Sequence, residues 1–143
     1  MKKLLLILAC PLLFAVAGFA QEHFTEGPVW RVTLVKVKPA QMDTYLTSLR
    51  QASKPLFDEQ KRQGLIMDYK VFFKETQEGP HDWDIALAVQ YKNYAAMDGL
   101  TAKSEAIRDK VMGGKQQAQQ VAEKRMEIRE IVSSELLQEI MLK

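Results

Sequence analysis

Two stretches of apolar–polar alternation restrict the fold of this chain more than any other feature of its sequence. In the first stretch, the apolar members of one face are Leu65, Met67, Tyr69, Val71 and Phe73. In the second stretch, they are Trp83, Ile85, Leu87, Val89 and Tyr91. Because side chains alternate between the two faces of a strand, each stretch predicts a strand with one buried face. The polar link between them, which contains Gly79 and Pro80, predicts a hairpin loop.

The segments on either side of this hairpin have strand and helix patterns in turn. Residues 29–38 are rich in β-branched side chains and predict a strand. Pro39 fits the first turn of a helix that extends to Gly64, with a kink at Pro55. A second helical region covers residues 93–114, is weakened by Asp98-Gly99 and continues as a further piece over 115–125, before a fourth strand over 126–133.

The order strand, helix, strand, strand, helix, strand predicts an α+β fold with a four-stranded antiparallel sheet. We expect the helices on one face of the sheet and the first and third strands at its centre. Residues 134–143 predict an additional amphipathic helical tail, with Ser134 as its N-cap. The apolar side chains of this tail should pack on a helix face of the same subunit or of another one.

The start of the chain has the pattern of a secretory signal peptide. Two lysines precede an apolar run that extends to Ala17, and small residues follow up to Ala20. We therefore predict that residues 1–20 are a signal peptide, that cleavage falls between Ala20 and Gln21, and that the mature protein is periplasmic or secreted. The apolar run contains Pro11 and is shorter than the roughly 20 residues that a stable membrane anchor needs. No stable anchor is expected after cleavage.

Composition limits the classes of function that remain. Residues 21–143 have the length of one domain, and their acidic and basic side chains balance once the two lysines of the signal are removed. A neutral chain without a block of like charge gives no reason to expect nucleic acid as a partner. The single cysteine, Cys10, lies within the signal, where lipid attachment is the alternative to simple cleavage. The mature chain therefore has no disulfide and no thiolate ligand, and we expect no cofactor and no metal.

Five short segments resemble a known superfamily. They are Val29–Val32 at the first strand, Val37–Pro39 entering the helix, Trp83–Ile85 in the third strand, Tyr91–Asn93 before the second helix, and Arg129–Ile131 in the last strand. With this element order, the chain resembles the dimeric α+β barrel superfamily, in which two ferredoxin-like sheets pack face to face. It is similar to small secreted bacterial proteins of that fold with no assigned activity, over residues 28–133. The resemblance implies a ferredoxin-like fold and a homodimer, and it implies no particular reaction, since functions differ widely among proteins of one fold.

A ligand pocket is expected on the sheet face opposite the helices. If Trp30, Val32 and Leu34 face the helices, then a polar set points into the barrel between two subunits: Arg31, Thr33, Asp68, Lys70, Asp84 and Gln90. Together with Val35, Phe72, Ala86 and Ala88, this set matches the usual lining of a small-molecule site. The same charged residues would alternatively form a buried salt-bridge network across the dimer interface.

Acid–base chemistry has few candidates in this sequence. His81 and Asp82 in the hairpin loop could act as a general base and its carboxylate partner, or could be solvated loop residues. Asp82 and Asp84 lie two positions apart and would share one side of a strand. Three functional hypotheses follow: a homodimer that binds a small, partly apolar molecule in the barrel; a structural or interaction protein with a barrel filled by side chains; and an enzyme similar to the cofactor-independent monooxygenases.

Overall fold

The computed structural model describes residues 23–143, and the predicted signal peptide lies outside them. The elements follow the chain as β1 (Phe24–Val37), α1 (Met42–Ser48), α2 (Lys54–Arg62), β2 (Asp68–Phe73), β3 (Ile85–Tyr91), α3 (Leu100–Val111), α4 (Lys115–Ile128) and β4 (Arg129–Leu142). A π-helical segment (Leu49–Ser53) joins α1 to α2, and a 3₁₀ turn (Tyr94–Met97) precedes α3.

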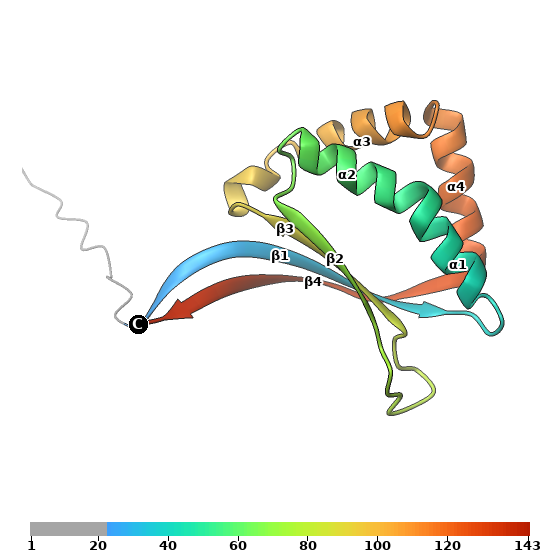
Figure 1. The fold of residues 1–143 in the computed structure, drawn as a ribbon, viewed down its shortest axis with the longest axis horizontal. Coiled ribbons are helices and arrows are strands. Elements are labelled where there is room, and N and C mark those ends of the chain that lie inside the picture. Colours follow the sequence, from blue (N-terminus) through green and yellow to red (C-terminus); the bar gives the residue numbers. More distant parts are fainter. Residues whose placement is uncertain (1–22) are drawn as a thin grey trace, which may run out of the picture.

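The strands form one antiparallel sheet with the order β2-β3-β1-β4. The helices of the described chain lie on one side of this sheet, and the other face, called the open face below, has no helix over it (Figure 1). β1 and β3 occupy the centre, as the sequence predicts. The predicted α+β topology is therefore confirmed.

Pro55 explains the irregular path of the first helical region. Proline has no amide hydrogen, so the α-helical hydrogen bond from residue 55 to Gln51 cannot form. The helix widens into a π-helical turn just before this position, where the amide of Lys54 donates to the carbonyl of Leu49, five residues earlier. Pro55 itself lies in the first turn of α2, where a missing amide hydrogen costs least. The predicted kink is thus a π-helical segment, and Gly64, with φ of +71°, follows the end of α2 in the left-handed conformation that the sequence predicts there.

The sequence-based assignment of the two faces of β1 is wrong. Arg31 pairs with Val89 and Thr33 pairs with Leu87, and these residues line the side of the sheet that carries the helices. The apolar residues Trp30, Val32 and Leu34 instead lie on the open face. Both rows of β1 contain apolar side chains, because Val29, Val35 and Val37 flank Arg31 and Thr33 in the helix-facing row. Alternation alone therefore does not identify the buried face of this strand.

The predicted helical tail is also wrong. Residues 134–142 continue β4 and pair with β1 as far as Phe24 opposite Leu142. The paired ends of β1 and β4 extend beyond β2 and β3 as a two-stranded ribbon (Figure 1). Along this ribbon the backbone groups of the tail pair with those of β1, whose outer edge a helical tail would leave without a partner strand.

The core divides into two clusters between the sheet and the helices. One contains Val35, Val37, Tyr45, Leu49 and Ile85. The other contains Ile66, Val89, Tyr91 and Leu100, against which Phe57 of α2 packs. Together they fix α1 and α2 over the sheet, and the space that remains between α2, α3 and the strands forms the pocket described next.

Candidate functional site

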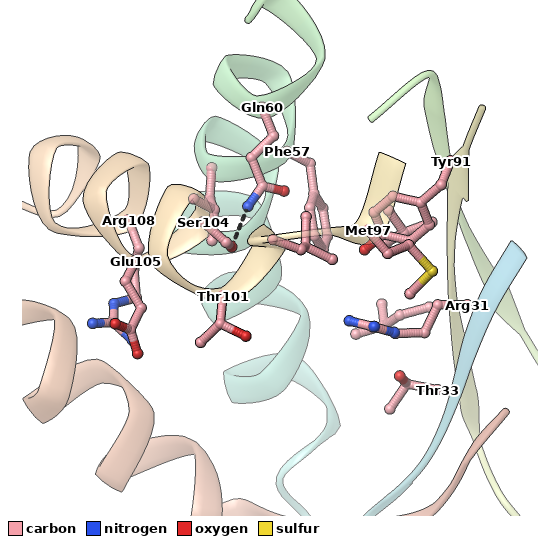
Figure 2. A pocket seen from close by; sticks show the side chains of 14 residues that line it. Arg31, Thr33, Phe57, Gln60, Tyr91, Met97, Thr101, Ser104, Glu105 and Arg108 are labelled. Carbon is pink, nitrogen blue, oxygen red and sulfur yellow. Dashed lines mark hydrogen bonds between the residues drawn. The ribbon is translucent and has the colours of Figure 1, made fainter. Parts of the chain in front are cut away.

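A pocket of about 450 Å³ lies between the helix-facing side of the sheet and helices α2 and α3. Figure 2 shows its side chains converging from both layers. The sheet contributes Arg31, Thr33, Leu87, Val89 and Tyr91. The helical layer contributes Leu56, Phe57, Gln60, Met97, Leu100, Thr101, Ser104, Glu105 and Arg108. A concave space with an apolar lining and a few polar groups is the usual form of a small-molecule site.

Arg31 is the polar group that distinguishes this pocket. It comes from a central strand, and its guanidinium carbon lies 5.5 Å from the centroid of the Tyr91 ring, a cation–π arrangement. No carboxylate of residues 23–143 forms an ion pair with it within 4.0 Å. In Figure 2 its guanidinium points toward the middle of the pocket, above Thr33. The wall around it is apolar, so an anion that entered would meet a cation with few competing partners.

The Tyr91 ring, against which Arg31 lies, is itself buried. Burial raises the pKa of the Tyr91 hydroxyl, and the positive charge of Arg31 opposes that rise. The phenol is therefore neutral at physiological pH. A neutral ring provides a fixed surface for the guanidinium, and Tyr91 has no role as a base under these conditions.

The far end of the pocket is formed by α3. Gln60 donates to the Ser104 hydroxyl at 2.8 Å, which joins α2 to α3 across the top of the site (Figure 2). Arg108 donates to Asp109 at 2.9 Å, so its charge is already balanced. Thr101 and Glu105 complete this end. Arg31 is thus the lining cation without a carboxylate partner among the described residues.

The structure separates the residues that the sequence places in one cavity. Arg31 and Thr33 line the pocket on the helix side, whereas Asp68, Lys70 and Gln90 belong to the open face. Asp68 pairs directly with Gln90 and forms an ion pair with Lys61 at 2.8 Å. Lys70 lies opposite Ala88, and its ammonium is 5.4 Å from the centroid of the Trp30 ring.

Asp84 has a structural role at the start of β3. It is buried, and it accepts hydrogen bonds from the amide of Val37 at 2.8 Å and from the Gln77 side chain at 2.8 Å. The ammonium of Lys36 lies 3.6 Å away. These contacts tie the hairpin loop and the end of β1 to β3. Asp84 is therefore not among the residues that line the pocket at Arg31.

The hairpin loop does not assemble an acid–base pair. His81 is exposed, and Asp82 forms an ion pair with Lys74 rather than with His81. The amides of Glu78 and Trp83 also donate to Asp82, at 3.0 and 2.9 Å. The Lys74 hydrogen bond, then these amides, lower the pKa of Asp82 to about 2. A carboxylate held so firmly in its ionised form is a poor proton donor or acceptor near neutral pH.

Sequence reasoning missed the helical half of the site. Gln60 is buried on α2, and this polar side chain within an apolar helical stripe is the signal that could have marked it. Thr101 and Ser104 carry no such signal, since hydroxyl residues are common on exposed helix faces. Within residues 23–143, no cluster of three or more His, Cys, Asp or Glu side chains could hold a metal ion. None of the helices in that part of the chain combines the length and apolar character that crossing a membrane requires.

Comparisons with known proteins concern the fold. No family model matches the sequence, and no curated protein matches it. HapK from Hahella chejuensis is 9% identical, with a TM-score of 0.53 over 78% of this chain and 91% of HapK. A NIPSNAP family protein of unknown function from Agrobacterium tumefaciens is 14% identical, with a TM-score of 0.49 over 82% of this chain and 88% of its own. A dimeric protein of unknown function and ferredoxin-like fold from Bacteroides fragilis is 13% identical, with a TM-score of 0.47 over 82% and 99%.

At these identities, the likeness is one of fold alone. The strand order, with β1 and β3 in the centre and the helices on one face, is that of a ferredoxin-like protein. The chain therefore has the ferredoxin-like fold, and the resemblance inferred from its sequence is confirmed at that level.

Proposed function

We propose that this chain is an exported, homodimeric ferredoxin-like protein that binds a small, partly apolar molecule carrying a carboxylate. The ligand lies in the pocket between the sheet and helices α2 and α3, with its carboxylate on Arg31. The observation that carries this proposal is the Arg31 guanidinium, stacked on Tyr91 without an acidic partner among the described residues.

Charge and shape both support a carboxylate ligand. A guanidinium in a partly apolar pocket needs a partner of opposite charge, and its planar fork matches a carboxylate. Phe57, Val89 and Leu100 offer apolar surface for the rest of the molecule. The volume of about 450 Å³ falls within the usual range of small-molecule pockets. The proposed site therefore lies within each subunit, whereas the sequence predicts it in the barrel between two subunits.

The test compares two probes that share an apolar body and differ in their head group, a charged carboxylate or a neutral amide. We expect the mature chain to bind 3-phenylpropionate more tightly than 3-phenylpropanamide in isothermal titration. Arg31→Gln should reduce the affinity for the acid by at least about tenfold and leave the amide unchanged, because a charge-assisted hydrogen bond is lost. Arg50→Gln, which removes an exposed arginine outside this pocket, is the matched control. Equal affinity for acid and amide in the wild-type protein would contradict the proposal.

One measurement can test both the identity of the native ligand and the predicted cleavage of the signal peptide. Native mass spectrometry of the protein recovered from the periplasm reports its first residue, its subunit number and any bound molecule. We expect a chain that starts at Gln21, in a dimer with an acidic molecule bound. A chain that retains residues before Gly18 would contradict the export step. A dimer that carries no ligand and does not respond to the probes would support the structural role instead.

A further inference from the structure

A second groove lies between α1 and α4. Its volume is about 720 Å³. Helix α1 contributes Thr44, Thr47 and Ser48, and α4 contributes Val121, Lys124 and Arg125. None of these residues lines the pocket at Arg31, so the two spaces are separate.

Arg125 uses only one edge of its guanidinium in the fold. Its Nε donates to the Ser48 hydroxyl at 2.9 Å, and its Nη2 donates to the Ser48 carbonyl at 3.2 Å. A guanidinium has five N–H donors arranged along two edges that can each bind a pair of oxygens. The edge formed by Nη1 and Nη2 has no further acceptor in the described chain. One bidentate edge is therefore available in the groove.

The charges around Arg125 are mostly positive. Arg129 lies nearby and donates to the Tyr45 hydroxyl at 3.2 Å, and Lys124 belongs to the groove. Burial, and then the charge of Arg129, lower the pKa of Arg125. Glu127 is the acidic residue of the lining; it is exposed and forms no ion pair with either arginine in residues 23–143. A partly buried cation beside other cations is unfavourable unless an anion balances it.

We propose that the groove between α1 and α4 binds a small oxyanion, a carboxylate or a phosphate group, on the free edge of Arg125. Lys124 adds charge, and the hydroxyls of Thr44 and Thr47 add donors. The position of Arg125 in the last turn of α4 favours a cation through the helix dipole. The helix dipole accounts for a positively charged residue at this end of α4, but it provides no hydrogen-bond acceptor for the Nη1–Nη2 edge. That edge remains available to a ligand.

The test uses two anions that share an apolar body. Phenyl phosphate and phenylacetate are titrated into the ¹⁵N-labelled mature chain at constant ionic strength, with benzyl alcohol as the neutral control. We expect an anion to shift the Arg125 Nε–H resonance and the alcohol to leave it unchanged. Binding of either anion supports the site, and the tighter one identifies the head group. A shift of Arg31 without a shift of Arg125 would overturn the proposal, as would no shift of either residue.

Variants separate this site from nonspecific attraction. Arg125→Lys keeps the charge but loses the bidentate edge, so affinity should fall by about tenfold. Lys124→Gln changes an exposed side chain and should weaken binding by roughly two- to fivefold without affecting the fold. Arg50→Gln, which removes an exposed arginine outside the groove, should leave this affinity unchanged. If Arg50→Gln weakens binding as much as Lys124→Gln does, the attraction is nonspecific and the proposal fails.

Discussion

Asp82 shows how one carboxylate can organise an exposed loop. It receives the Lys74 ammonium and two backbone amides, and the same ammonium lies 5.0 Å from the centroid of the Trp83 ring. These donors lower the pKa of Asp82 to about 2 from its usual 3.8. Because the folded pKa lies below the unfolded one, the contribution to stability is complete above about pH 4. It is lost as the pH falls toward 2.

We therefore predict that Lys74→Met raises the pKa of Asp82 back toward 3.8, since the largest cause of its lowering is removed. An NMR titration of the Asp82 carboxyl carbon measures this directly. The wild-type loop should keep its native amide shifts to a lower pH than the variant does. Lys92→Met, which removes an exposed lysine elsewhere, is the control. A titration midpoint that Lys74→Met leaves unchanged would contradict the assignment.

The different fates of Arg31 and Asp84 show what the sequence could not determine. Both are charged residues within strand-like patterns, and both were expected in one cavity. Backbone pairing decides otherwise: the Val37 amide, at the end of β1, captures Asp84, whereas Arg31 faces Val89 on the helix side. Which row of a strand is buried depends on its neighbours whenever both rows are apolar. The pocket could therefore be located only from the pairing register of the strands, and a local sequence pattern does not contain that register.

In β4, too, the local sequence pattern fails to predict the structure, here over a whole segment. Leu136, Leu137, Ile140 and Met141 fit one face of a helix, but in the strand they divide between its two faces. An edge strand with apolar residues on both faces has no period of two, so the helical reading is the natural one. β2 and β3 were predictable because one face of each strand is much more apolar than the other. The central position of β1 and β3 followed from the order of elements alone.

Truncation tests the contribution of the C-terminal half of β4. Ending the chain after Ser134 removes the pairing partners of β1 from Phe24 to Val32. We expect the melting temperature to fall by several degrees, since backbone hydrogen bonds and the apolar contacts along them are lost. Removal of Leu142 and Lys143 alone should have a much smaller effect. A truncated protein that melts with the full-length one would show that this ribbon adds no stability.

The open face of the sheet supports the proposed homodimer. Trp30, Val32 and Leu34 lie on it beside Ala86 and Ala88, and Phe72 and Leu137 remain 49% and 48% exposed at its sides. Exposed apolar surface of this kind is usually covered by another molecule. A second copy of the same face is the simplest cover, because a two-fold axis pairs each patch with itself.

Val32→Glu provides the corresponding prediction. The cross-strand neighbours of Val32 are Ala88 and Glu135, so the new carboxylate has no basic partner across either strand pair. We expect the dimer to weaken by roughly 2–5 kcal/mol, measured by sedimentation at several concentrations. Leu46→Glu, on an exposed position of α1, is the matched control and should leave association unchanged. If Val32→Glu sediments as the wild type does, the open face is not the interface.

The pairing of the first strand with the last one affects when the chain can fold. Trp30 and Glu139 are hydrogen-bonded across 109 positions, and the amide of Lys143 donates to the carbonyl of His23. Contacts between such distant positions form slowly, because the intervening loop must close before they stabilise anything. β1 therefore lacks its outer neighbour until synthesis has reached the final residues. For the export that we propose, such a delay would be favourable, because a polypeptide must still be unfolded when it is threaded through a membrane.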